Sequence, residues 1–495
     1  MTMDEKFPHP VYKDTVLAPL FEGVKAHYVG AFRAINRAHL VMLTETGILP
    51  LEKSRRIAAA LVDIDDTVDV ASLTYTGEVE DYFFLVEAEL KKRLGPDIAG
   101  MLHTARSRND MDHTVFKLVL KAHADALIAK ARTLAAALID KAEAERDTLI
   151  VAYTHGQPAQ PSTFGHYLAA AVEVLLRDTE RLQAARANID HCPMGAAAIT
   201  TSGFPIDRKR MAKLLGFAGP LRNSYGCIAS VDYVTGFYAA MKLTFLHLGR
   251  LIQDMQFWSA FEVGQLHVPA SLVQISSIMP QKRNPVPIEH LRHLASMTCG
   301  RADAIVNTMH NTPFTDMNDS EGEVQVAGYA AFESGSRVLD LLAALIGAVT
   351  IDAGRVAKNI DAACITVTEL ADTLVRAEDL SFRQAHEIAA ATARAVIAAG
   401  KPLGEGHAAF AEAFRNLSGR DSTLTESAYA ETVSARHFVA LRERFGGPGP
   451  QAMDEALAAY RASLTSLSEQ QAAGLARAAR AEAALDAAFG ALLQE

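Results

Sequence analysis

Hydrophobic residues recur along most of the chain with the spacing of α-helices. One stripe with steps of four and seven residues consists of Phe116, Leu120, Leu127, Leu134 and Leu138. Residues at these steps fall on one face of a helix. The pattern therefore predicts a long amphipathic helix whose apolar face is buried.

Three further segments, at about 166–187, 232–261 and 335–357, have the same helical character. The segment 232–261 is apolar on nearly all sides, so it should be surrounded by other helices. Strand-like alternation occurs only in short pieces, and no strand is followed by the glycine-rich turn of a dinucleotide or P-loop site. These patterns predict an all-α fold built around a bundle of long helices.

The length of 495 residues predicts two or three domains. Glycine and proline clusters suggest an N-terminal helical domain at 1–110, a central long-helix bundle at 111–361 and a C-terminal helical domain at 362–495. Helices of this length usually need packing partners beyond one chain. We therefore expect a homo-oligomer that shares a bundle core.

The composition narrows the class of protein. A hydrophobic fraction of 49% with 21% charged residues is that of a globular protein, and the net charge of −10 argues against nucleic acid or an anionic membrane as a partner. No apolar run reaches the ~20 residues of a membrane span, and the N-terminus lacks a signal peptide, so a cytoplasmic location is expected. Four scattered cysteines predict buried thiols, without disulfides or a zinc site.

The segment SSIMPQKRNP at 276–285 has the most informative chemistry. It is a polar, proline-interrupted loop that offers hydroxyls, backbone N–H groups, a lysine and an amide. Such groups can hold a carboxylate while negative charge develops on it. The alternative is that the prolines only start the following helix, where Pro287 would lie in the first turn.

This loop resembles the signature GSSxMPxKxNP of the fumarase/aspartase superfamily, with Ile275 in place of the leading glycine. Further blocks are similar to those of the argininosuccinate lyase branch: HTARSRND at 103–110, THGQPAQP at 154–161 and FPIDR at 204–208. The resemblance implies a three-domain, mainly helical fold. It also implies a homotetramer in which the bundles of four chains pool and each active site is built from three chains.

The implied reaction is an anti β-elimination that releases fumarate from an N-substituted aspartate. In the family, the first serine of the loop removes the proton, which assigns this role to Ser276. Lys282, Asn284 and the N–H groups near Ser277 would stabilise the dianion that forms, and Met279 of the same loop would contact substrate.

His155 is the second candidate for proton transfer. An isolated histidine is more often solvated or structural, but the block around His155 resembles a family block linked to acid catalysis or substrate orientation. The resemblance implies that Glu289 supports it. Thr154 and Gln157 would then form hydrogen bonds to substrate.

The block at 107–109 should hold the other end of the fumarate unit. Arg108 and Asn109 fit a clamp for a carboxylate and Ser107 lies beside them. His290 and His293 could ligate a metal, but no third ligand is evident. The elimination is expected to need no cofactor or metal, because the substrate carboxylate accepts the electrons.

The chain departs from the branch where the amine half of the substrate would bind. HYVGAFR at 27–33 replaces the family string WGGRF, and Glu80-Asp81-Tyr82-Phe83 replaces EDIH. Ungapped alignment puts Phe314, Asp319 and Gly322 at the family's Tyr, Gln and Lys.

These departures predict an amine other than arginine, as in the ethylenediamine-N,N′-disuccinate lyases, which act on aminopolycarboxylates. The alternatives are argininosuccinate lyase itself and a non-catalytic protein like the lens crystallins of this family.

Overall fold

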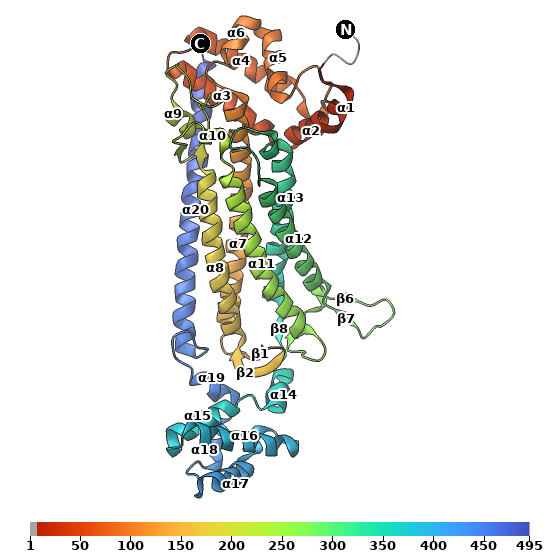
Figure 1. Cartoon of the computed structure of the whole chain (residues 1–495), viewed down its shortest axis with the longest axis vertical. Coiled ribbons are helices and arrows are strands. Elements are labelled where there is room, and N and C mark those ends of the chain that lie inside the picture. Colours follow the sequence, from red (N-terminus) through yellow and green to blue (C-terminus); the bar gives the residue numbers. More distant parts are fainter. Residues whose placement is uncertain (1–6, 495) are drawn as a thin grey trace.

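Long helices form the middle of the molecule, as the apolar stripes predict. In the computed structural model, which describes residues 7–494, these helices run side by side along the longest axis (Figure 1). The central helices are α7 (Arg108–Ala144), α8 (Phe164–Ile189), α11 (Asp232–Ser259), α12 (Val286–Thr308) and α13 (Gly322–Ala348). Their facing sides supply most of the main hydrophobic core, so the expected all-α fold around a long-helix bundle is confirmed.

A cap of shorter helices covers the end of the bundle where α7 begins (Figure 1). Its elements are α1 (Pro10–Tyr12), a π-helical turn (Lys13–Leu17), α2 (Ala18–His27), α3 (Val29–Glu45), α4 (Leu51–Thr67), a 3₁₀ turn (Val70–Ser72), α5 (Tyr82–Leu94) and α6 (Pro96–Met101). Two more short helices, α9 (Arg208–Leu214) and α10 (Gly226–Ala229), lie near the same end. The cap shares one continuous core with the bundle.

The opposite end of the bundle carries a small helical domain with a core of its own, which includes Leu374, Ile388, Phe410 and Tyr429. Its elements are α14 (Ala353–Ala363), α15 (Val367–Glu378), α16 (Phe382–Ala398), a 3₁₀ turn (Leu403–Glu405), α17 (His407–Ser418), α18 (Glu426–Thr432) and α19 (Ala435–Ala440).

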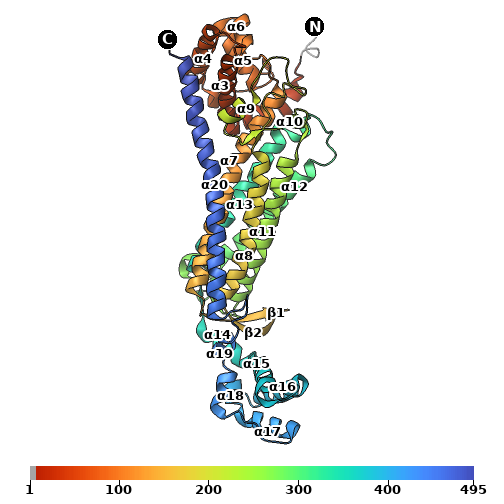
Figure 2. The same cartoon turned by 90° about the vertical axis from the view of Figure 1, so that its left-hand side faces the viewer.

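The final helix, α20 (Pro450–Leu492), does not stay with this small domain. It returns along the whole bundle and packs against α7 and α8 (Figure 2). The expected C-terminal domain at 362–495 thus contains a tail helix that packs on the bundle and ends beside the cap.

In the described part of the chain, four small two-stranded sheets connect the helices. The pairs are β1 (Leu149–Thr154) with β2 (Gln157–Thr163), β3 (His191–Cys192) with β4 (Gly219–Pro220), β5 (Leu266–His267) with β8 (Thr350–Ile351), and β6 (Gln274–Ile275) with β7 (Arg283–Asn284). Single 3₁₀ turns lie at Ala270–Leu272 and Asn318–Ser320. The helix expected at 335–357 is wrong in its bounds. The β-branched residues Thr350 and Ile351 leave helical geometry and pair with β5 instead.

Two further observations concern the apolar character of the helices and the state of the thiols. Within residues 7–494, no helix combines the length and apolar character that crossing a membrane requires. All four cysteines are free; three are buried and Cys299 is half-buried, which agrees with the expected absence of disulfides.

Candidate active site

Two of the three sequence blocks of the expected site lie far apart within one chain. Residues 107–109 begin α7, whereas residues 154–157 follow its other end (Figure 1). With 37 residues in α7 and a rise of 1.5 Å per residue, the two blocks are separated by about 55 Å. A single chain therefore does not bring together the side chains of these blocks.

Ser107 caps the first turn of α7. Its hydroxyl accepts a hydrogen bond from the Asn109 N–H, and Asp110 accepts one from the Ser107 N–H at 2.9 Å. The Asp110 carboxylate also accepts from the backbone N–H groups of Gly195 and Ala197. This capping box explains the local position of the block, since a Ser with an acid three residues later satisfies free N–H groups at a helix start.

Arg108 is half-buried and faces acidic neighbours. Its guanidinium lies 2.5 Å from Asp81 and 3.1 Å from Glu80, and it stacks over Phe84. Asp81 also caps α5 by accepting from the Phe84 N–H. The expected use of Arg108 as a carboxylate clamp therefore requires substrate to compete with two carboxylates.

His155 stands at the tip of the β1–β2 hairpin. His155 and Gly156 both have positive φ angles, of 54° and 75°, as in the tight turns that connect antiparallel strands. Thr154 and Gln157 pair across the strands directly below them. All four residues are exposed, so the hairpin presents the block outward.

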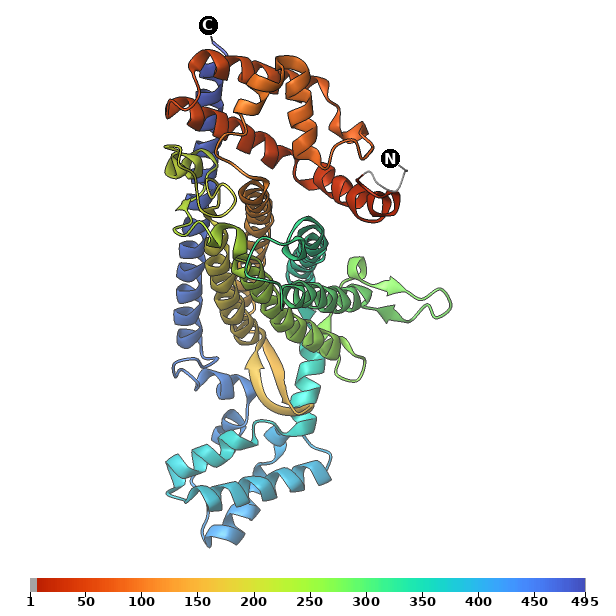
Figure 3. The ribbon, with the colours of Figure 1, turned by 45° about the horizontal axis from the view of Figure 1, so that its top comes forward.

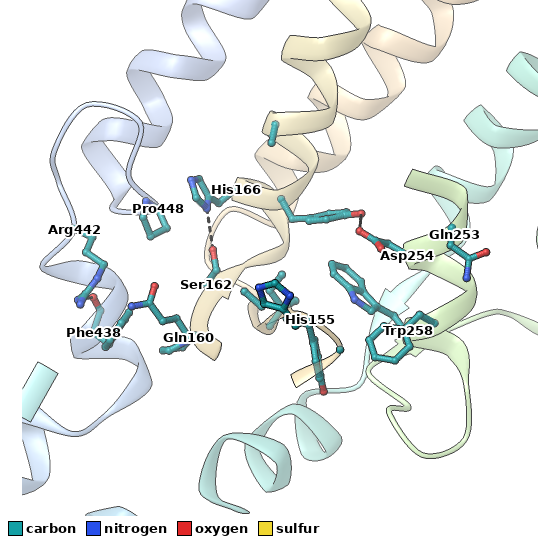
Figure 4. A pocket seen from close by; sticks show the side chains of 18 residues that line it. His155, Gln160, Ser162, His166, Gln253, Asp254, Trp258, Phe438, Arg442 and Pro448 are labelled. Atoms are coloured by element: carbon teal, nitrogen blue, oxygen red, sulfur yellow. Dashed lines mark hydrogen bonds between the residues drawn. The ribbon is translucent and has the colours of Figure 1, made fainter. Parts of the chain in front are cut away.

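A cavity of about 620 Å³ lies behind the hairpin, between the bundle and the loop that follows α19 (Figure 4). His155 lies on its wall. Inside it, His166 pairs with the Ser162 hydroxyl at 2.9 Å and with the Gly446 carbonyl at 3.1 Å. These bonds join the hairpin, α8 and the small domain at one point.

The signature loop extends from the bundle as a separate arm between β6 and β7 (Figures 1 and 3). The Ser276 hydroxyl accepts from the N–H groups of Met279 at 3.1 Å and Ile278 at 3.4 Å. Ser277, Met279 and Lys282 are exposed, and Asn284 is half-buried at the base of the arm. Donors at the serine oxygen favour its ionised form, as the proton-abstracting role requires.

Glu289 lies in the first turn of α12 and is exposed, as is His155. Among the described residues no hydrogen bond links the two, so their expected coupling is not formed within one chain. His290 and His293 bind each other at 3.2 Å. They belong to no cluster of three metal-ligating groups in the described part of the chain, where a single such cluster occurs elsewhere.

An acidic cleft of about 540 Å³ opens beside residues 108 and 109, between α2, the start of α5, the start of α7 and the start of α13. Of the three positions aligned with the family's amine-binding residues, Asp319 and Gly322 line it. Phe314 lies outside the lining, where it stacks on Tyr225. The carboxylates that line the cleft are Glu80, Asp81, Asp112, Asp316, Asp319, Glu321 and Glu323, and Arg108 is the only lysine or arginine among the lining residues.

The inner wall of this cleft contains groups that sequence reasoning missed. His113, Asp316 and Glu321 have side-chain ligand atoms within 4.8 Å of one another. His113 is 1% exposed. Its Nε2 lies 3.3 Å from an Asp316 oxygen, yet neither atom has a hydrogen-bond partner within residues 7–494.

Burial and neighbouring negative charges raise the pKa of acids in the cleft. Burial raises the pKa of Glu321, and the adjacent Asp316 raises it further. Burial, then Glu321 and Asp81, hold the pKa of Asp112 well above its ordinary value.

The acidic run DMNDSEGE at 316–323 was a visible signal of this cleft in the sequence, but its convergence with α7 depends on the tertiary fold.

The chain is similar to known proteins along most of its length. The family model described as "Lyase" matches residues 42–300, and one described as "Argininosuccinate lyase C-terminal" matches residues 364–440. The chain is 66% identical to argininosuccinate lyase 2 of Agrobacterium fabrum over 93% of this chain and 91% of that protein. It is 34% identical to the argininosuccinate lyase of Methanoculleus marisnigri over 93% of this chain and 91% of that protein. A crystal structure of EDDS lyase in complex with formate superposes with a TM-score of 0.83 at 28% identity, covering 98% of this chain and 96% of that one.

Proposed function

Because the chain belongs to the argininosuccinate lyase branch of the fumarase/aspartase superfamily and is a carbon–nitrogen lyase, we propose that it releases fumarate from argininosuccinate and leaves arginine. The main support is the 66% identity, over nearly the whole chain, to a relative named argininosuccinate lyase 2. This ordering reverses the expectation from sequence alone, which favoured an aminopolycarboxylate.

In the proposed reaction Ser276 acts as the base. Its alkoxide takes the proton from the carbon beside a carboxylate of the aspartate unit. The remaining electron pair forms the double bond of fumarate as the carbon–nitrogen bond breaks, and the nitrogen gains a proton. Lys282, Asn284 and the N–H of Ser277 stabilise the carboxylate that carries the developing charge.

The remaining predicted residues hold the substrate. Thr154, Gln157 and the Ser107–Asn109 block bind the two carboxylates of the fumarate unit, and Met279 closes the apolar side. His155, oriented by Glu289, completes the proton transfers.

These roles require a homotetramer in which three chains contribute to each site. The length of α7 supports this assembly, because it separates two of the blocks by about 55 Å. The arm at 276–285 supports it too: Ile275 and Ile278 are 72% and 82% exposed in the single chain, and apolar groups of this kind favour contact with another surface.

Elimination of fumarate from ethylenediamine-N,N′-disuccinate is the second candidate. It is favoured by the loss of the family's Tyr, Gln and Lys around residues 314–322 and by the likeness to EDDS lyase. A lost lysine contact to the distal carboxylate of arginine would cost roughly 1.5–3 kcal/mol in binding.

The experiment offers both substrates to purified protein and follows fumarate by its ultraviolet absorbance. We expect argininosuccinate to be the better substrate and Ser276→Ala to lower kcat by at least about 10³-fold. Ser271→Ala, at an exposed position in the 3₁₀ turn before the arm and outside the signature, is the matched control. Turnover of ethylenediamine-N,N′-disuccinate alone would replace the first candidate by the second, and no fumarate from either would contradict both.

A further inference from the structure

The acidic cleft carries a more specific conclusion about the amine half of the substrate, which rests on the proposed fumarate-releasing function. The cleft contains seven lining carboxylates and one arginine, and that arginine is already paired with Asp81 and Glu80. A cluster of this charge is unfavourable unless a cation enters it.

Buried acids elsewhere in the chain are compensated differently. Within the described residues, each of the five fully buried carboxylates has a hydrogen-bond donor or an ion-pair partner; these residues are Asp110, Asp178, Asp190, Glu369 and Glu378. In the cleft, by contrast, one Asp316 oxygen and the Nε2 of His113 lie 3.3 Å apart, and neither atom makes a hydrogen bond within residues 7–494. The unpartnered atoms thus occur where the acids gather.

The three acceptors at the inner wall match a primary ammonium group. His113 Nε2, Asp316 and Glu321 converge to within 4.8 Å of one another, and an ammonium has three N–H donors at about 2.9 Å from their acceptors. His113 is held in place because its ring packs edge-on against Phe116 and its Nδ1 lies 3.5 Å from the Tyr233 hydroxyl. An N–H donor between His113 and Asp316 would satisfy both unpartnered atoms at once.

We propose that His113, Asp316 and Glu321 bind a terminal ammonium on the leaving amine. The cleft thereby selects amines that carry this ammonium, whether or not they also carry a carboxylate. Arginine meets the requirement through its α-ammonium. Ethylenediamine-N,N′-disuccinate does not, because the far end of its leaving amine carries a second succinate dianion that would face the lining carboxylates. Asp112 lines the same cleft.

Three amines of similar length test the proposal in the direction of addition to fumarate. Arginine has the ammonium and the carboxylate, (4-aminobutyl)guanidine has only the ammonium, and 5-guanidinopentanoate has only the carboxylate. In each case a nitrogen–carbon bond forms as the double bond of fumarate is lost, so the fall in fumarate absorbance reports the rate.

Loss of the ammonium should lower kcat/KM by about 10- to 100-fold, whereas loss of the carboxylate should change it by less than about threefold. Asp316→Asn and Glu321→Gln should each remove most of this discrimination by raising KM for the two ammonium-bearing amines. Glu333→Gln, an exposed position on the same helix α13, is the matched control and should keep the ranking.

The outcomes separate this inference from the proposed function. Equal rates for arginine and 5-guanidinopentanoate in an active wild-type enzyme would overturn the ammonium site and leave fumarate release standing. No fumarate chemistry with any amine or with argininosuccinate would contradict the proposed function itself. If chelator-treated enzyme loses the discrimination and Zn²⁺ or Mg²⁺ restores it, the three side chains bind a metal and the proposal is overturned.

Discussion

Two groups of acids, one in the small C-terminal domain and one in the cleft, are treated in opposite ways by their surroundings. Glu378 is 3% exposed and accepts hydrogen bonds from Arg420 at 2.6 Å, Ser422 at 2.6 Å and the Thr423 N–H at 2.7 Å. Asp316, in the cleft, has an unpartnered oxygen and Glu321 as a carboxylate neighbour. The first acid joins the end of α15 to the loop after α17, whereas the second has no such set of donors within residues 7–494.

The two environments also shift the pKa values of the acids in opposite directions. Burial alone would raise the pKa of Glu378, but the hydrogen bonds from Ser422, Arg420 and Thr423 lower it to about 2. In the cleft, burial and like charges raise the pKa of Asp112 and of Glu321. The difference teaches that a buried acid with many donors contributes to stability, and one with acidic neighbours costs stability and indicates a binding role.

The largest expected effect on stability comes from the buried acid of the small domain, Glu378. Glu378→Ala leaves Arg420, Ser422 and Thr423 without their shared acceptor, so we expect the free energy of unfolding to fall by about 2–3 kcal/mol. Denaturant unfolding measured by circular dichroism tests this. Glu412→Ala, at an exposed position of α17, should change it by less than about 0.5 kcal/mol. Equal effects of the two variants would contradict the structural role of Glu378.

A second, smaller effect concerns the loss of stability at low pH. Because the pKa of Glu378 is lower in the folded state than the ordinary value of 4.5, its stabilisation is complete above that ordinary value and is lost as pH falls through about 2. The stability difference between wild type and Glu378→Gln should therefore shrink between pH 5 and pH 2. Thermal unfolding across that range measures it, and a constant difference would show that the hydrogen bonds do not depend on ionisation.

The smallest effect has the opposite sign and lies in the cleft. Asp112 faces Glu321, Asp81 and Asp316, with Arg108 as the opposing charge. Because the pKa of Asp112 is raised in the folded protein, its contribution to the free energy of unfolding is most favourable below the ordinary pKa of an aspartate. This contribution is lost as the pH rises through the raised pKa of the folded state. Asp112→Asn should thus stabilise the protein at pH 8 by about 1 kcal/mol and have little effect at pH 4. Destabilisation at pH 8 would remove the contrast between the two groups of acids.

Much of the fold could be predicted because helical periodicity is a local signal. The stripe from Phe116 to Leu138 lies in α7, and Pro287 lies in the first turn of α12 as expected. The helix expected at 335–357 was wrong because Thr350 and Ile351 pair with β5, and that pairing joins segments more than 80 residues apart in the chain. Periodicity within a window does not contain such a partner.

The candidate site could be predicted only in part, for the same reason. The motifs identify Ser276, His155 and the 107–109 block as separate strings, and their assembly stays a prediction. His113, Asp316 and Glu321 were missed because two elements distant in sequence, α7 and the start of α13, bring them together. An isolated histidine inside a helical stripe looks like any other buried residue until its neighbours are known.

The exposed arm has a consequence for the life of a newly made chain. Ser276 and its neighbours lie on a polar loop joined to the bundle by two short strands, and such loop tips are where proteases cut most readily. In the proposed tetramer the arm would be covered by neighbouring subunits. A chain that fails to assemble would then lack activity and also expose a cleavage site, so proteolysis would remove incomplete molecules first.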